Sequence, residues 1–213
     1  MALKNIDFWE KLLKNMPNSY RRWFEEERKY LLKHITKNAK VLEVGCGDGR
    51  SIKDILDITT NIVGIDHDEK AVADAKNNFK DYKTIRILKA KAENLPFENK
   101  EFDFVICMTT FANFADSKQK VLSEMKRVLK DDGFIIISVF SEDAFEERMK
   151  MYKKLNAPIK EIKGTMVIFN EEIGDNVSEQ FSKEQLVGIF SKANLSVVDI
   201  KKKGIAYLCK LKK

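Results

Sequence analysis

The fold is decided by the stretch 41–50, Val41-Leu42-Glu43-Val44-Gly45-Cys46-Gly47-Asp48-Gly49-Arg50. Its first four residues predict a buried parallel strand, and residues 51–56 after it begin a helical pattern. The three glycines between them bring bare backbone close to a ligand at the carboxyl end of a sheet. The N-terminus of the following helix then points its free N–H groups at that ligand.

The composition is that of one globular domain, with 213 residues of which 44% are hydrophobic and 34% charged. The net charge is +6, but 33 acidic residues accompany 39 basic ones. We therefore expect a solvated, lysine-rich surface of mixed sign rather than a nucleic-acid groove. The three cysteines, Cys46, Cys107 and Cys209, lie far apart and without CxxC or CxxH spacing. They argue against a disulfide framework and a structural zinc site, so no metal is expected.

The N-terminal residues do not resemble a signal peptide, because charged side chains interrupt their apolar ones. The longest apolar run, residues 134–140, is far too short to span a bilayer. Together with the unpaired cysteines, these observations predict a soluble protein in a reducing compartment, the cytoplasm.

Strands and helices alternate along the first two thirds of the chain. Apolar periodicity predicts strands over residues 41–44, 61–66, 84–90, 102–107 and 134–140, and helices over 51–57, 69–79 and 118–129. Asp131-Asp132-Gly133 is expected to turn into the fifth strand. Near-continuous apolar strands that alternate with helices predict an α/β fold, with a doubly wound, mostly parallel sheet covered on both faces.

The pattern loosens in residues 141–180, which we interpret as an insertion above the carboxyl edge of the sheet. From there on we expect a helix over 143–155, short strands over 159–162, 166–169 and 176–181, a helix over 182–192, and strands over 195–200 and 205–211. Ser182 and Gln185 form a predicted capping box for the second helix. The last two strands meet at Gly204 in an antiparallel hairpin, which completes a seven-stranded sheet.

The chain begins with two predicted helices, over residues 5–15 and 20–35. Asn18 or Ser19 is expected to cap the second of them. Both helices are either a packing layer on the sheet edge or a lid whose Tyr20 or Trp23 closes over the glycine turn. We expect a single domain, residues 1–213, made of N-terminal helices (1–37), a Rossmann-like core (38–140 and 181–213) and the insertion (141–180).

The glycine spacing is GxGxG, whereas the third glycine of a dinucleotide-binding GxGxxG turn leaves the helix N-terminus on a pyrophosphate. The spacing here allows close backbone approach and suits a ligand without a pyrophosphate. Asp66 ends the second strand, next to the first in this topology, where an acid can accept both hydroxyls of a ribose. A nucleoside-containing cofactor follows, although NAD enzymes share this ribose contact.

Five blocks, in their order along the chain, resemble the motifs of one family. They are VLEVGCGDGR (41–50), VGIDHDEKAV (63–72), AENLPFENKEFDFVICMTTFANF (92–114), VLSEMKRVLKDDGFIIIS (121–138) and FSKEQLVGIFSKANLSVVDI (181–200). The chain is similar to the class I methyltransferases that use S-adenosylmethionine, in their small-molecule branch. The resemblance implies a Rossmann-like fold, S-adenosyl-L-methionine as cofactor and S-adenosyl-L-homocysteine as its product.

Carried over residue by residue, the resemblance implies nine cofactor-binding residues: Glu43, Gly45, Cys46, Gly47, Asp66, His67, Ala92, Glu93 and Met108. The glycine turn would line the methionine moiety, and Glu43 would orient that turn or receive the amino group through water. Asp66 would bind the ribose hydroxyls, Met108 would lie near the sulfonium, and the three residues between them would flank the adenine. Lys91 stands where relatives usually carry an aspartate, and a lysine cannot accept a hydrogen bond from the adenine amino group.

The implied reaction is an in-line displacement at the sulfonium methyl, for which the enzyme aligns the reacting groups and excludes water. A reactive amine or thiol acceptor needs no base, whereas a weakly acidic hydroxyl does. Candidate bases by composition are His34, Glu171, Glu172 and Asp175. None of them has a motif behind it, so the sequence identifies no catalytic residue.

The main hypothesis is a methyltransferase of a small-molecule acceptor, contacted by the N-terminal helices, the loop 109–114 and the insertion 141–180. An RNA or protein acceptor is an alternative, motivated by the lysine content and by the run 201–203, which otherwise forms a solvated turn. A non-catalytic S-adenosylmethionine-binding module is another, supported only by Lys91. A nicotinamide oxidoreductase is disfavoured by the glycine spacing. Acceptor identity, methylated atom and oligomeric state do not follow from the sequence.

Overall fold

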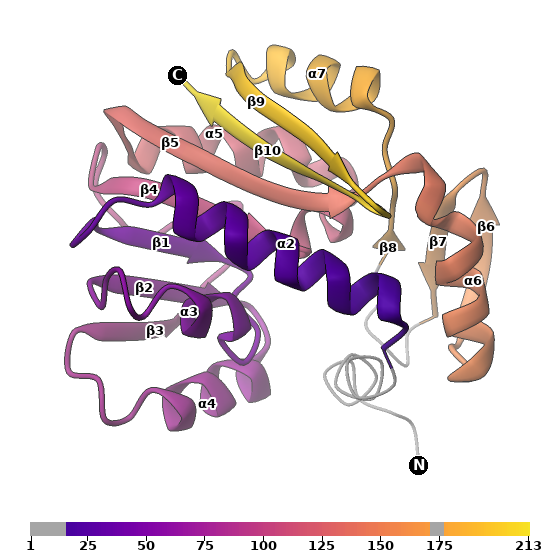
Figure 1. Ribbon diagram of the computed structural model, residues 1–213, viewed down its shortest axis with the longest axis horizontal. Coiled ribbons are helices and arrows are strands. Elements are labelled where there is room, and N and C mark those ends of the chain that lie inside the picture. The colour runs from indigo at the N-terminus through magenta and orange to yellow at the C-terminus, as the bar shows by residue number, and fades with distance from the viewer. Residues whose placement is uncertain (1–15, 171–176) are drawn as a thin grey trace.

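The computed structural model describes residues 16–170 and 177–213, and its centre is a seven-stranded sheet (Figure 1). The strands are β1 (Val41–Val44), β2 (Ile62–Asp66), β3 (Ile85–Lys89), β4 (Phe102–Met108), β5 (Leu129–Phe140), β9 (Ser196–Lys203) and β10 (Ala206–Lys212). Their order is β3-β2-β1-β4-β5-β10-β9, in which β10 pairs antiparallel with both β5 and β9 and the other pairs are parallel. The predicted fold class is confirmed, and the strand order reverses beside β1, where open α/β sheets bind their ligands.

Helices cover both faces of the sheet, as the apolar strands require. They are α2 (Asn18–His34), α3 (Arg50–Asp54), α4 (Glu69–Asn78), α5 (Lys118–Val128) and α7 (Lys183–Lys192). All four residues of β1 are buried, and so are the inward residues of α5 at core spacing. Figure 1 shows α2 crossing one face of the sheet and α5 on the other. Two short 3₁₀ turns, η1 (Thr110–Asn113) and η2 (Ala115–Ser117), connect β4 to α5.

Helix α2 packs on the sheet, as one of the two interpretations of the N-terminal helices predicts, and the lid role stays a prediction. Trp23 is 1% exposed, and its indole N–H donates to the Ser138 hydroxyl on β5 at 2.6 Å, so the helix is a packing layer. Tyr20 and Trp23 also reach the cavity at the glycine turn. The predicted cap is wrong: Pro17 is the N-cap and makes no side-chain bond, while the Ser19 hydroxyl donates to Glu147. The predicted helix 5–15 lies outside the described residues.

Strand β5 starts earlier than its apolar run. It begins at Leu129, so the predicted turn at residues 131–133 is instead part of the strand. The pairing of β4 with β5 shifts register between Phe102 and Phe104, which accommodates these polar residues as an irregularity of the ladder. A Cβ on Gly133 would lie 2.7 Å from the Asp103 carbonyl oxygen, so this position needs a glycine for close approach.

The segment between β5 and α7 forms a small layer of its own beyond the carboxyl ends of the parallel strands (Figure 1). It contains η3 (Glu142–Ala144), α6 (Phe145–Lys154) and a separate sheet of β6 (Ile159–Lys163), β7 (Met166–Phe169) and β8 (Val177–Ser178). It leaves and rejoins the core at one place, because Ser141 forms a parallel bridge with Phe181 and the Phe181 N–H donates to the Phe140 carbonyl at 3.1 Å. The capping box of α7 at Ser182 and Gln185 is confirmed.

Candidate functional site

A cavity of about 920 Å³ opens at the carboxyl ends of the strands, around the glycine turn. Its walls come from α2, the turn after β1, the end of β2, residues 90–93, the segment after β4, the end of β5 and α6. All nine residues with an implied cofactor role line it: Glu43, Gly45, Cys46, Gly47, Asp66, His67, Ala92, Glu93 and Met108. The structure therefore brings the predicted residues together, while their contacts with a cofactor stay predictions.

The glycine turn has a backbone that other residues adopt only with strain. Gly45 has a φ of +74°, and a Cβ there would lie 2.3 Å from Cγ2 of Thr110. Gly47 has a φ of +55°, with open space where its Cβ would be. The Thr110 hydroxyl donates to the Gly45 carbonyl at 2.9 Å, which ties the segment after β4 to the turn. Thr110 lies in the loop 109–114 that the sequence assigns to the acceptor, but its bond to the glycine turn was not predicted.

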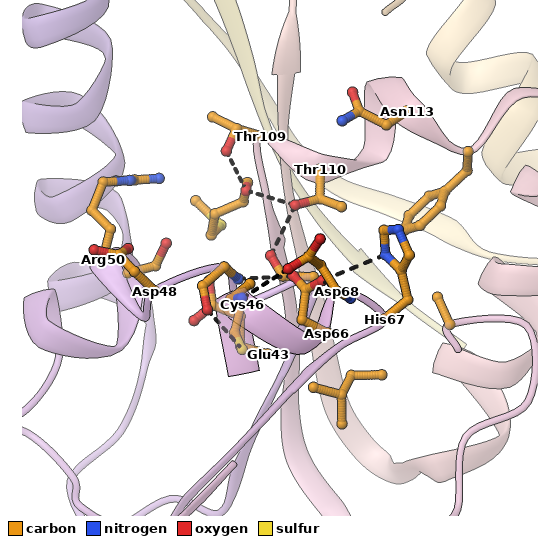
Figure 2. A pocket seen from close by; sticks show the side chains of 18 of the residues that line it. Glu43, Cys46, Asp48, Arg50, Asp66, His67, Asp68, Thr109, Thr110 and Asn113 are labelled. Atoms are coloured by element: carbon orange, nitrogen blue, oxygen red, sulfur yellow. Dashed lines mark hydrogen bonds and ion pairs between the residues drawn. The ribbon is translucent and has the colours of Figure 1, made fainter. Parts of the chain in front are cut away.

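The Asp66 carboxylate is held at the end of β2 by backbone donors (Figure 2). The Gly47 N–H donates to Oδ2 at 2.9 Å, and the Asp68 N–H donates to Oδ1 at 3.0 Å. Burial alone would raise the pKa of Asp66, but hydrogen bonds from His67 and these two N–H groups outweigh it and hold that pKa below its usual range. Asp66 is thus ionised at neutral pH, and its oxygens keep lone pairs for further donors.

Glu43 lies beneath the turn and is 1% exposed. Burial raises its pKa to about 8, against opposing effects of a hydrogen bond from Ser51 and the charge of Arg50. Its Oε2 atom has no hydrogen-bond partner although it lines the cavity wall. At neutral pH this raised pKa leaves the Glu43 carboxyl largely protonated, and a cationic group of a ligand bound against the unpartnered oxygen would favour its ionised form.

Arg50 lines the cavity together with Glu43, and no sequence pattern indicated its ion-pair partner, Glu27. Its Nη2 atom lies 2.6 Å from Oε2 of Glu27, a fully buried acid on α2, and its guanidinium lies 3.9 Å from the centre of the Phe24 ring. Burial raises the pKa of Glu27, and the charge of Arg50 opposes that rise. The sequence indicates the Arg50–Glu27 pair only weakly, because the helix that contains Glu27 is predicted from its apolar residues alone.

Lys91, the residue that departs from the pattern of the resembling family, lies on the side of the cavity expected to hold the adenine. His67 pairs with Asp66, whose hydrogen bond raises the pKa of the His67 imidazole. Lys91 lines the cavity beside Ala92 and Glu93, so a cation stands where relatives usually place an acid. Figure 2 shows His67 and Arg50 on opposite sides of the turn, with Asp66 between them.

The far end of the cavity is aromatic. Tyr20 and Trp23 from α2, Phe140 at the end of β5 and Tyr152 from α6 line it, and the Trp23 and Phe140 ring centres lie 4.7 Å apart. The sequence reasoning did not single out Phe140, which could have been found as the last residue of a parallel strand, where such sheets place ligands. Tyr152 lies in the insertion 141–180 that was expected to contact the acceptor, although no pattern marks this residue within it.

Other predicted or excluded groups lie elsewhere. His34 packs on the Tyr30 ring, 4.4 Å between centres, and does not line the cavity. Glu171, Glu172 and Asp175 lie outside the described residues. Burial raises the pKa of the Cys46 and Cys107 thiols, which keeps them protonated and consistent with packing roles. Within residues 16–170 and 177–213, no three His, Cys, Asp or Glu side chains gather where they could hold a metal ion.

The cavity fits a nucleoside that carries a positive charge at its other end. An ionised acid at the end of β2 suits a ribose diol, and the unpartnered Glu43 oxygen under an open glycine turn suits an ammonium or sulfonium. Within the described residues, no helix is long enough and apolar enough to cross a membrane.

Comparisons with known proteins agree with this chemistry. A family described as a methyltransferase domain matches residues 42–137. An uncharacterized protein of Methanocaldococcus jannaschii is 33% identical over 181 residues, which cover 71% of this chain and 82% of that protein. The demethylmenaquinone methyltransferase of Staphylococcus saprophyticus is 31% identical over 62% of this chain, and the match spans 60% of that enzyme.

The fold has the same relatives. A solved structure of an S-adenosylmethionine-dependent methyltransferase from Aquifex aeolicus superposes with a TM-score of 0.68 at 20% identity, covering 95% of this chain and 96% of that one. The chain belongs to the methyltransferase-domain family and has the Rossmann-like class I methyltransferase fold.

Proposed function

We propose that this enzyme transfers the methyl group of S-adenosylmethionine to a small-molecule acceptor bound at the aromatic end of the cavity. One observation carries the proposal: a single cavity runs from the glycine turn to the aromatic wall of Tyr20, Phe140 and Tyr152. That wall is enclosed by α2 and α6, so an acceptor there would be sheltered from water. Such a cavity suits a compact molecule better than a nucleic-acid strand.

A bound cofactor would supply an electrophilic methyl carbon on a sulfonium. The acceptor lone pair would form a bond to that carbon in line as the carbon–sulfur bond breaks, and S-adenosylhomocysteine would leave as a neutral thioether. The protein holds both reactants. Asp66 accepts hydrogen bonds from the ribose hydroxyls, and the unpartnered Glu43 oxygen faces the cationic end. Met108, 2% exposed at the end of β4, forms the apolar floor between the two binding ends. Alignment and exclusion of water account for the rate in such a reaction.

The lysine run that motivates an RNA acceptor is engaged in ion pairs. Lys201 lies 3.5 Å from Asp199, Lys203 lies 3.0 Å from Glu26, and Lys202 pairs with Glu142 at 2.9 Å and also with Asp143. Paired lysines release fewer counterions on binding phosphates, which favours the small-molecule acceptor. The relative named for demethylmenaquinone also supports a small acceptor.

The proposed division of labour assigns the whole chain to one domain. The core, residues 38–140 and 181–213, would hold the cofactor. The N-terminal segment 1–37 and the insertion 141–180 would enclose the acceptor. A cytoplasmic location stays a prediction.

The test follows the methyl group. The enzyme is incubated with S-adenosylmethionine tritiated at the methyl and with a cell extract separated into small-molecule, RNA and protein fractions. We expect label in the small-molecule fraction; label in RNA or protein alone refutes the proposal. Calorimetry with S-adenosylhomocysteine and with NAD is the control for cofactor choice, because only the former should bind.

A further inference from the structure

Tyr20 presents a hydrogen-bonding group that nothing in the described structure uses. The residue is 2% exposed and lines the aromatic end of the cavity, yet its hydroxyl has no hydrogen-bond partner. Burial raises the pKa of this hydroxyl far more than the nearby charge of Arg148 lowers it, so the group is a neutral donor. A buried hydroxyl without a partner on a cavity wall indicates that a ligand supplies the acceptor atom.

Arg148 lies behind the same wall and carries a charge without a counter-charge. The side chain is fully buried on α6. Its guanidinium donates to neutral acceptors only: the Gln180 side-chain oxygen at 2.8 Å, the Ser178 hydroxyl at 2.9 Å, and the carbonyls of Thr165 and Ser178. Its Nε has no partner, and no ion pair of Arg148 occurs in the described part of the chain.

The charge of Arg148 is separated from the cavity by one layer of rings. The guanidinium carbon lies 4.9 Å from the centre of the Phe140 ring and 5.8 Å from that of Tyr152, and both rings line the aromatic end. Glu147 acts on Tyr20 with the opposite sign, but its effect on the pKa of Tyr20 is smaller than that of Arg148. The field at the aromatic end is therefore positive on the side of Arg148.

The neutral hydrogen bonds of Arg148 fasten β8 to α6, and a structural role would explain them. It would not explain the missing counter-charge, because burying a lone cation is costly and a neutral donor would fasten the same carbonyls. An anionic group that enters with the acceptor would remove this cost. The uncompensated cation and the unused hydroxyl thus point to the same missing partner.

We propose that the acceptor is a planar aromatic molecule with an ionised oxygen, which accepts a hydrogen bond from Tyr20 and balances the buried charge of Arg148. The inference rests on the proposed small-molecule function and names the class of its acceptor. Acceptors that carry a positive charge are excluded by the same field. An anionic acceptor is also attracted to the sulfonium across the cavity, and methyl transfer neutralises that pair.

The probes are 2-naphthoate and the neutral 2-naphthamide, of nearly equal shape, titrated by calorimetry into enzyme saturated with S-adenosylhomocysteine. We expect 2-naphthoate to bind about tenfold tighter or more. In Gln180→Glu, a carboxylate replaces the amide 2.8 Å from Arg148 and should cancel this preference without removing the arginine. Tyr20→Phe should weaken 2-naphthoate and keep the affinity for S-adenosylhomocysteine.

A second readout needs no acceptor. Gln180→Glu pairs a lone buried cation but loses the hydrogen bond that the Gln180 amide donates to the Glu142 carbonyl. Its Tm should therefore exceed that of Gln180→Met, which loses the side-chain hydrogen bonds without adding a charge; a Tm no higher than that of Gln180→Met overturns the inference. Equal binding of the two probes, binding of neither, or a preference that persists in Gln180→Glu overturns it as well. In those cases intact binding of S-adenosylhomocysteine leaves the proposed function standing, whereas loss of that binding in the unaltered enzyme refutes the function itself.

Discussion

Replacing Asp66 tests the placement of the cofactor most directly. In the structure its two carboxylate oxygens already accept the N–H groups of Gly47 and Asp68, at 2.9 and 3.0 Å, which orients both for a ribose diol. A hydrogen bond to a charged group contributes about 1.5–3 kcal/mol, part of which water recovers when the acid is removed. Asp66→Ala should therefore lose about 1–3 kcal/mol of binding free energy, or about 5- to 150-fold in Kd for S-adenosylhomocysteine.

Asp66→Asn separates charge from shape. An asparagine has one acceptor oxygen, so it can satisfy only one of the two N–H groups and presents its amide donor to the other. We expect a loss close to that of the alanine variant, because orientation fails together with charge. Asp74→Ala is the matched control, because it removes the same charge from the lining of the same cavity. The Asp74 side chain, however, is partly exposed and pairs with Lys70 on the surface.

The assay is isothermal titration calorimetry with S-adenosylhomocysteine, on variants whose folding is verified by urea unfolding. The folding check matters because Asp66→Ala also removes the anchor of the glycine turn. The control should change the Kd by less than about twofold. An Asp66→Ala variant that is folded and binds with unaltered affinity would refute the placement of the ribose at β2.

Three further predictions concern stability. Burial raises the pKa of Glu43 from 4.5 to about 8, so folding favours its protonated form. The stability of the enzyme should therefore fall as the pH rises from about 4.5 through about 8. Glu43→Gln should flatten this part of the Tm–pH curve. Gly45→Ala should cost more than about 2 kcal/mol in urea unfolding, since a left-handed φ costs about 1–2 kcal/mol and Thr110 clashes in addition; Thr110→Ser should restore part of it. Arg50→Met should cost about 3–5 kcal/mol because it strands Glu27, and adding Glu27→Gln should recover much of that loss.

Each of these has an outcome that contradicts it. A Tm–pH curve of Glu43→Gln that parallels the unaltered enzyme means that other groups set the pH dependence. Full stability of Gly45→Ala means that the turn relaxes into another conformation. Additive losses in the Arg50 and Glu27 double variant mean that the two side chains act independently.

The mostly parallel main sheet and its final hairpin could be predicted because their signals are local or topological. Apolar strands alternate with helices, right-handed crossovers restrict their order, and Gly204 with a φ of +57° makes the final hairpin. The capping box at Ser182 is likewise a pattern within four residues. The gathering of the nine predicted residues around one cavity was predictable for the same reason, since most of them follow strand ends, while their contacts with a cofactor stay predictions.

What could not be predicted depends on partners far apart in the chain. Ser19 is a residue type that commonly caps helices, but its hydroxyl donates a hydrogen bond to Glu147, 128 residues away in the sequence. Tyr20 and Tyr152 meet at one wall although 132 positions separate them, and no periodicity in either helix indicates that meeting. Long-range packing overrides local propensity at such sites.

The bridge between Ser141 and Phe181 has a consequence for how this enzyme could change its chemistry. Because the segment between them departs and returns at one point of the sheet, its ends are already close, and replacing it leaves the strand pairings of the core untouched. Lengthening, shortening or exchanging residues 142–180 would alter the acceptor wall while keeping the glycine turn and Asp66. The architecture is therefore suited to recombination: one donor platform can be combined with interchangeable acceptor segments, for instance in laboratory chimeras.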